Sequence, residues 1–198
     1  MDITVTETFQ RTHEAYNEII NQEEIDHNKL EVVAPIYRYR QIVSMGGSRS
    51  SKSYSILQLL LLEMVSRKGI KITVWRNLKN VCRTSVLEDF QKIIMFDYKI
   101  FKNIKENKQA GSFTYMPTKS KIVFEGADSI GKVLGGTQDI SFFNEISEFS
   151  KRVYLEIRQR TADRVFCDYN PSKNFFLEDY RMDDETCFIH SNFEQNAF

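Results

Sequence analysis

The residues with the clearest chemistry form a glycine- and serine-rich stretch that apolar runs flank on both sides. Gly46 and Gly47 open it, and Lys52 and Ser53 close it. In such a turn, backbone N–H groups can point inward and hold an anion, and the positive end of a following helix strengthens the site. A lysine at this spacing reaches the β and γ phosphates of a nucleotide, and the hydroxyl after it ligates Mg2+. The stretch therefore predicts a phosphate-binding loop.

The predicted loop departs from the common pattern at one position and carries an extra charge at another. Ser51 stands where a glycine usually precedes the lysine. Arg49 lies inside the loop and can stabilise charge on a transferred phosphoryl group. A Ser/Gly-rich turn before an ordinary helix is the structural alternative. The residues expected to bind the nucleotide are Gly46, Gly47, Ser48, Arg49, Ser50, Ser51, Lys52, Ser53, Tyr54 and Asn170.

A second polar pair directly follows an apolar run. The run 140–143 predicts a buried strand, and Asn144 and Glu145 come immediately after it. A carboxylate at the end of such a strand can accept a proton from an attacking water or orient it. Glu148 is the fallback if the register differs, and two surface polar residues closing a strand are the structural alternative. The catalytic residues expected are Glu145, Arg49 and Lys52.

The predicted metal site combines Ser53 with Asn144. An aspartate is commoner at the position of Asn144, because its carboxylate brings negative charge to the metal. An amide can hydrogen-bond a metal-bound water but supplies no charge. We therefore expect weak Mg2+ affinity.

Three residues beyond this pair offer further chemistry. Asn170 closes the next predicted strand and can sense the γ phosphate, although Asn170 and Pro171 together also suit a plain turn. Arg158 and Arg160 lie on a predicted helix after Glu145, where they can serve a neighbouring subunit or form surface salt bridges. We favour salt bridges, but the choice between these arginines and the loop arginine stays open.

The elements that must position these residues alternate between strands and helices. Apolar residues at helical spacing predict helices, and short β-branched or aromatic runs between turn signals predict strands. The predicted helices are 7–25, 52–67, 81–96, 150–161 and 175–181, and 105–112 is a predicted loop. The predicted strands are 38–43, 70–75, 140–143, 165–171 with its turn, and 186–190, with a hairpin-like pair at 113–115 and 121–124. This alternation predicts an α/β fold of three layers around a largely parallel sheet.

The composition bounds the class of protein. With 41% apolar and 27% charged residues in 198, the chain has the make-up of one globular domain. No apolar run is long enough to cross a bilayer, and the start lacks the pattern of a signal peptide. The three cysteines are widely spaced, which predicts reduced thiols, no zinc site and a cytoplasmic location.

Basic residues cluster in two runs although the formal net charge is zero. Between 67 and 83 there are six basic residues and no acid, and between 99 and 121 there are six lysines against one glutamate. Such segregation predicts a surface for a polyanion, with a merely solvated face as the alternative for either run.

In this order the motifs resemble the ATPase half of the large terminase subunit of tailed bacteriophages, the motor that drives DNA into an empty capsid. The resemblance rests on the loop 46–53, on 75–79 with 83–86, on 132–135 before 142–148, on 169–171 and on 190–198. It implies a P-loop ATPase domain over 36–198. The first 35 residues are expected to form a helical appendage or lid.

The resemblance also implies an activity and partners. It implies ATP and Mg2+ as cofactors, hydrolysis coupled to translocation of double-stranded DNA, and a place in the host cytoplasm. The implied partners are double-stranded DNA, a capsid portal, a small terminase subunit and copies of the chain in a ring. The family's C-terminal nuclease is missing from the sequence, so we expect an isolated ATPase domain.

Two other functions stay open. A nucleotide-binding or docking module with weak or no hydrolysis is favoured by the departures at Ser51 and Asn144. Another P-loop translocase or helicase is the third possibility, although a second set of helicase motifs is not visible.

Overall fold

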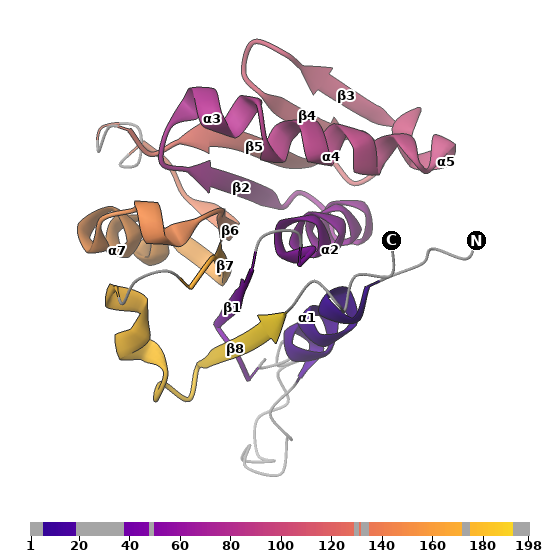
Figure 1. Cartoon of the computed structure of the whole chain (residues 1–198). Coiled ribbons are helices and arrows are strands. Elements are labelled where there is room, and N and C mark those ends of the chain that lie inside the picture. The colour runs from indigo at the N-terminus through magenta and orange to yellow at the C-terminus, as the bar shows by residue number, and fades with distance from the viewer. Residues whose placement is uncertain are drawn as a thin grey trace, which may run out of the picture.

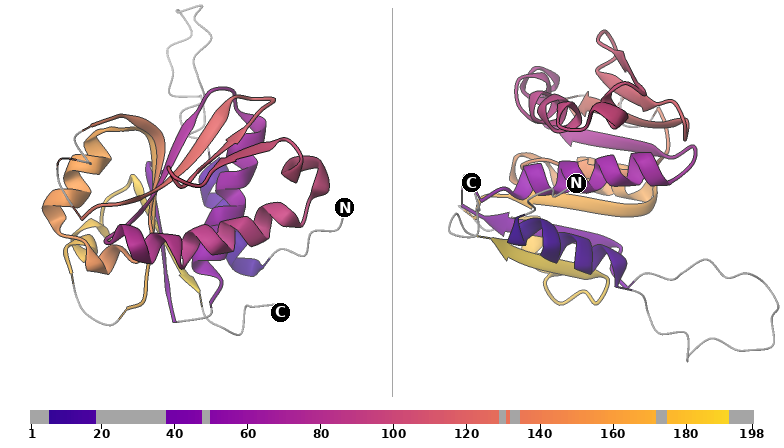
Figure 2. Two further views of the ribbon diagram at one scale, coloured as in Figure 1. Left: turned by 90° about the horizontal axis from the view of Figure 1, so that it is seen from above. Right: turned by 90° about the vertical axis from the view of Figure 1, so that its right-hand side faces the viewer.

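A central sheet with helices on both faces organises the chain (Figure 1). The structure is a computed structural model that describes residues 6–18, 38–47, 50–128, 131, 135–171 and 175–191. Within these residues the sheet has eight strands, in the order β3-β4-β5-β2-β6-β7-β1-β8. Figure 2 shows α1, α2 and α4 on one face and α7 on the other, which confirms the predicted three-layer α/β fold.

The sheet is parallel in its centre and antiparallel at one edge. The five pairs from β5 through β2, β6, β7 and β1 to β8 are parallel, whereas β3–β4 and β4–β5 are antiparallel. The strands are β1 (Gln41–Gly46), β2 (Lys71–Arg76), β3 (Ile104–Asn107), β4 (Ser112–Tyr115), β5 (Ser120–Gly126), β6 (Gln138–Phe143), β7 (Thr161–Tyr169) and β8 (Thr186–Ser191). Every predicted strand is present. The predicted loop 105–112 is wrong in its first part, because β3 occupies it.

The predicted helices are present in their predicted order, with one break, and the short α5 and η2 were not predicted. The observed helices are α1 (Glu7–Asn17), α2 (Lys52–Ser66), α3 (Lys79–Arg83), α4 (Val86–Met95), α5 (Tyr98–Phe101), η2 (Ile146–Glu148), α7 (Lys151–Gln159) and η3 (Phe176–Tyr180). The predicted helix 7–25 ends at Asn17, where Glu18 is extended, and 19–25 lie outside the described residues.

The break falls inside the predicted helix 81–96. The hydroxyls of Thr84 and Ser85 donate to the carbonyls of Asn80 and Val81, four residues back. Hydroxyl groups that compete in this way for backbone partners are neutral to unfavourable inside helices. The segment therefore forms two helices, α3 and α4, that meet at these two residues.

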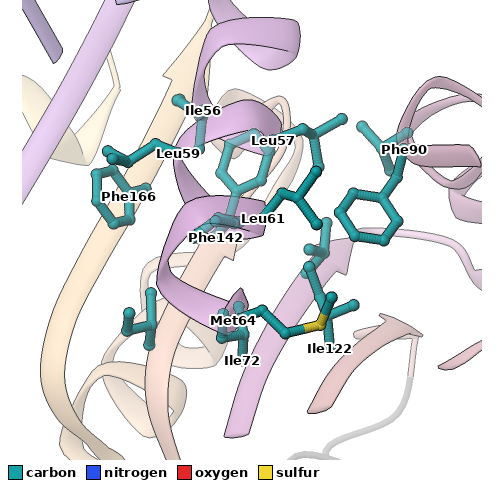
Figure 3. Packing of buried hydrophobic residues seen from close by; sticks show 14 of the residues in the cluster. Ile56, Leu57, Leu59, Leu61, Met64, Ile72, Phe90, Ile122, Phe142 and Phe166 are labelled. Atoms are coloured by element: carbon teal, nitrogen blue, oxygen red, sulfur yellow. The ribbon is translucent and has the colours of Figure 1, made fainter. Parts of the chain in front are cut away.

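The apolar side chains of the strands point alternately to the two faces of the sheet, and each face carries one hydrophobic cluster. Leu57, Leu60 and Met64 of α2 are fully buried against strand residues such as Phe142 and Phe166. Figure 3 shows this packing between the sheet, α2 and α4. Removing each such side chain from water contributes about 1.5 to 3 kcal/mol. Because strand side chains alternate, the intervening residues face α7 and form the second cluster.

Helix α1 packs on α2, beside the predicted phosphate loop. Its residue Tyr16 is buried in the same cluster as α2. The Thr6 hydroxyl lies 3.0 Å from the Ser55 hydroxyl, and the Thr8 hydroxyl donates to the Ser50 carbonyl at 3.3 Å. The start of α1 therefore contacts both the loop and the first turns of α2.

The two basic runs lie in different settings. Within the run 67–83, Arg67 pairs with Glu63 and Asp163, and Lys79 pairs with Glu125. The other run lies on α5 and the antiparallel edge, and among the described residues its lysines are exposed and form no ion pair. These edge lysines are Lys99, Lys102, Lys105, Lys108, Lys119 and Lys121.

None of the helices described is long and apolar enough to cross a membrane.

Candidate active site

The phosphate loop joins β1 to α2 at the carboxyl end of the sheet. Gly46 is the last residue of β1, paired with Ser191 of β8, and a Cβ there would lie 1.8 Å from the Ser191 carbonyl oxygen. Only glycine allows this close approach. Ser51 has φ 59°, in the left-handed region where the usual glycine would be unstrained. Ser48 and Arg49 lie outside the described residues, so the role expected of Arg49 stays a prediction.

Lys52 begins α2, and its ammonium group is enclosed by oxygen atoms. Nζ lies 2.9 Å and 2.8 Å from the carbonyl oxygens of Gly46 and Gly47, and 3.1 Å from the Ser50 hydroxyl. It also donates to Asn170 Oδ1 at 3.0 Å. Burial lowers the pKa of Lys52, against the raising effect of two nearby carboxylates. A phosphate at the loop would exchange these neutral partners for a charged one.

Asp168, a residue that the sequence analysis did not assign, lies at the centre of the site. It is fully buried on β7, which runs between the loop strand β1 and β6. The Ser53 hydroxyl donates to Asp168 Oδ2 at 2.5 Å, and the Glu145 N–H donates to Oδ1 at 2.6 Å. Burial raises the pKa of Asp168, although these hydrogen bonds oppose that effect. A carboxylate inside an apolar strand is the sequence signal that could have found it.

Asn144 points its amide nitrogen into the site and its oxygen away from it. Nδ2 donates to both Asp168 oxygens, at 3.1 and 3.0 Å, and to the Ser53 hydroxyl at 3.1 Å. Its Oδ1 accepts from Arg76 Nη1 at 3.0 Å. Arg76 also pairs with Glu148, the fallback carboxylate, at 3.3 Å.

Glu145 occupies a strained backbone position beside Asp168. Its φ of 56° is left-handed, a conformation that non-glycine residues adopt mainly where the surroundings impose it, as at active sites. Burial, and then the charge of Asp168, raise the pKa of the Glu145 carboxyl. Asn170 Nδ2 donates to Glu145 Oε1 at 3.4 Å, so Asn170 connects this carboxylate to Lys52.

Three other candidates lie apart from this cluster. Tyr54 is half-buried against the main hydrophobic cluster, near α4. Arg160 pairs with Glu156 at 2.8 Å, and its carbonyl accepts from Gln138 at the far end of the sheet. Arg158 lies over the ring of Tyr180, 5.3 Å from its centroid. The salt bridge that we favoured is thus present for Arg160, and Arg158 stacks on an aromatic ring instead.

These features define a P-loop NTPase. The parallel strands β6, β7 and β1 end side by side. Their ends bring together the Lys52 ammonium, the Ser53 hydroxyl and the acids Glu145 and Asp168. The chain belongs to the phage terminase large subunit family, whose sequence profile matches residues 38–198. No curated protein sequence matches it.

Solved structures share the fold at low sequence identity. The large terminase of a thermophilic bacteriophage matches with a TM-score of 0.75 and 11% identity, over 98% of this chain and 47% of that one. The HK97 bacteriophage large terminase matches with a TM-score of 0.65 and 9% identity, over 93% and 44%. The Thermus phage P74-26 large terminase ATPase domain matches at 0.55 and 14%, over 77% and 75%. The chain thus spans about half the length of the first two of these proteins.

Proposed function

We propose that the chain is the ATPase domain of a DNA-packaging motor, which hydrolyses ATP with Mg2+ and uses the energy to move double-stranded DNA into a procapsid. One observation carries the proposal. Lys52, Ser53, Glu145 and Asn170 come from three separate parts of the chain and meet in one hydrogen-bonded cluster. The thermophilic bacteriophage terminase that matches with a TM-score of 0.75 has also been solved in complex with ADP and with ATP-gamma-S, which supports a nucleotide at the equivalent loop.

The residues present fit a nucleotide with Mg2+. The loop offers backbone N–H groups and the Lys52 ammonium to phosphate, and Ser53 offers a hydroxyl next to a carboxylate. The described residues contain no group of three or more His, Cys, Asp or Glu side chains that could hold a metal. Mg2+ is usually bound through one or two carboxylates together with substrate phosphates, and Asp168 beside Ser53 offers one such carboxylate. When bound, the ion neutralises charge that develops on the phosphates.

Glu145 is the proposed general base. Its raised pKa makes the carboxylate a better proton acceptor near neutral pH than an exposed glutamate. The side-chain amide of Asn170 donates to one carboxylate oxygen of Glu145 and accepts from the Lys52 ammonium at the same time. A phosphate that displaces the lysine from Asn170 would therefore also free the amide to reorient the base. Arg49 in the same chain is the proposed arginine that stabilises the transferred phosphoryl group.

Steady-state ATPase measurements on Glu145→Gln test the assignment. We expect turnover to fall by about 100-fold or more, the range attributed to a lost general base, with ADP affinity kept within about threefold. Glu156→Gln, at the far end of α7, is the matched control and should hydrolyse ATP like the parent. If Glu145→Gln keeps the parent rate and Glu148→Gln loses it, the base is Glu148.

The proposed partners are double-stranded DNA, a capsid portal, a small terminase subunit and further copies of the chain in a ring, in the host cytoplasm. The edge lysines favour a DNA contact at α5 and β3 to β5, because they are exposed and form no ion pair with the described residues. Several cations of the run 67–83 already bind acids, so that run offers less free charge to DNA.

A nucleotide-binding module with little hydrolysis is the second candidate. Two observations favour it: Ser51 is strained where glycine is usual, and Asn144 brings no charge. An equilibrium titration with ADP, with and without Mg2+, followed by turnover in the presence of DNA, separates the candidates. Tight binding without turnover would support the module, and absence of binding would reject both.

A further inference from the structure

The position of Asp168 differs from the place where the sequence pattern puts a metal-associated acid. That place is the end of β6, which Asn144 occupies. Asp168 instead lies near the end of the neighbouring strand β7, in register with Ser44 of β1. Its Oδ2 atom is 2.5 Å from the hydroxyl of Ser53, the residue expected to ligate the ion.

The neighbours of Asn144 fix its amide so that it cannot offer its oxygen to an ion at Ser53. Arg76 only donates hydrogen bonds, and it contacts Oδ1 at 3.0 Å. Asp168 as a carboxylate only accepts them, and it contacts Nδ2 through both oxygens. Turning the amide over would place two donors together on one side and two acceptors together on the other. The site therefore presents the Asn144 N–H groups to Ser53 and Asp168.

We propose that Asp168 supplies the negative charge of the Mg2+ site and that Asn144 is a positioning residue, which holds this carboxylate beside Ser53. The proposal rests on the proposed function, because the ion enters with the nucleotide. The negative charge of the metal site then comes from β7 and not from the end of the neighbouring strand β6. The place at the metal expected of Asn144 passes to Asp168.

The surroundings of Asp168 suit this role. A buried carboxylate is costly unless it is hydrogen-bonded or paired with a cation. Here the donors come from two segments: the Ser53 hydroxyl at the start of α2, and the Asn144 amide with the Glu145 N–H in the connection between β6 and η2. They fix the carboxylate from several sides while its Oδ2 stays next to the Ser53 oxygen, so one ion can meet both atoms.

The alternative is a purely structural Asp168, which only anchors the backbone of Glu145. In that case the carboxylate would affect stability but would not affect how strongly Mg2+ promotes nucleotide binding. The measurement must therefore be the ratio of ADP affinities with Mg2+ and with EDTA, a quantity that does not depend on turnover. Mn2+ binding in the presence of ADP, followed by electron paramagnetic resonance, gives a second readout.

Four variants separate these roles. Asp168→Asn removes the charge and keeps the shape. Asn144→Ala removes the amide and keeps the charge, and Asn144→Asp with Asp168→Asn returns the charge to the end of β6. Asp139→Asn is the matched control, since this carboxylate lies at the other end of β6 and accepts from the Lys71 N–H. Thermal melting shows whether each variant is folded.

We expect Asp168→Asn to lose about 10- to 100-fold of the gain in ADP affinity that Mg2+ gives, with affinity in EDTA kept within about threefold. Asn144→Ala should lose part of the gain, because the carboxylate is held less firmly beside Ser53, but clearly less than Asp168→Asn loses. The exchanged pair should recover part of the gain, and Asp139→Asn should match the parent. An unchanged gain in Asp168→Asn overturns the proposal. If that variant does not fold, complete loss of the gain in folded Asn144→Ala, which keeps the Asp168 charge, overturns it instead. A parent protein that binds no ADP in either buffer would reject the proposed function itself.

Discussion

Replacing Ser51 with glycine should stabilise the protein, although glycine usually destabilises the start of a helix relative to residues that cap it. Ser51 has φ 59° and ψ 9°, and its side chain makes no cap hydrogen bond to α2. The left-handed conformation costs a non-glycine residue about 1 to 2 kcal/mol. Glycine removes that cost, but it lowers stability by about 0.4 to 1 kcal/mol because the unfolded chain has greater conformational freedom. The expected net gain is therefore about 0.5 to 1 kcal/mol.

Thermal unfolding without nucleotide measures this gain. For a chain of this size, about 1 kcal/mol shifts Tm by about 2 to 4 °C, so we expect Ser51→Gly to raise Tm by about 1 to 4 °C. Ser51→Ala is the matched control, because it removes the hydroxyl without relieving the backbone, and it should give no increase. Lys119→Gly tests the same reasoning far from the site, since Lys119 is exposed with φ 62°.

Two results would refute the reasoning. A lower Tm for Ser51→Gly would mean that the serine makes a favourable interaction greater than the backbone strain. An equal rise for Ser51→Ala would mean that the hydroxyl, and not the left-handed backbone, is the unfavourable feature.

Three further predictions concern other parts of the structure. Gly46→Ala should lower the free energy of unfolding by about 1 to 3 kcal/mol in urea titrations, because its Cβ would meet the β8 backbone. At Gly47 no atom lies within 4 Å of an added Cβ, so Gly47→Ala should change the free energy of unfolding by less than about 0.5 kcal/mol. If the edge lysines contact DNA, Lys105→Ala with Lys108→Ala should reduce the slope of log affinity against log salt by about 2, and an unchanged slope would exclude them. In iodoacetamide labelling read by mass spectrometry, Cys187 should react first, because it is partly exposed whereas the other two cysteines are buried, although burial raises the thiol pKa of all three; earlier labelling of either buried cysteine would contradict this.

The sequence predicted most of the elements, and it named most of the residues that meet in the cluster, because those signals are local. Apolar spacing and glycine punctuation placed the strands, and the loop pattern placed Lys52 and Ser53 where the structure has them. β3 was missed because it is a short, mostly exposed edge strand that carries Lys105 and Glu106, without an apolar face to alternate. Asp168 was missed because its importance depends on which strands are neighbours, and the order of strands is not a local property of the sequence.

The strand order also has a consequence for how the chain folds. β1 pairs with β7 and β8, which are synthesised much later than β1. The hydrogen bond from Ser53, just after β1, to Asp168 on β7 can therefore form only after a further 115 residues have been synthesised. At about 5 to 20 residues per second, a ribosome needs about 6 to 23 s to make that interval. During this time α2 has its leucine-rich face without the central strands that cover it. Contacts this distant in sequence also slow folding once synthesis ends. A fragment that stops before β7 would therefore keep the loop sequence but lack both the covered core and the carboxylate beside Ser53, and it would be prone to aggregation.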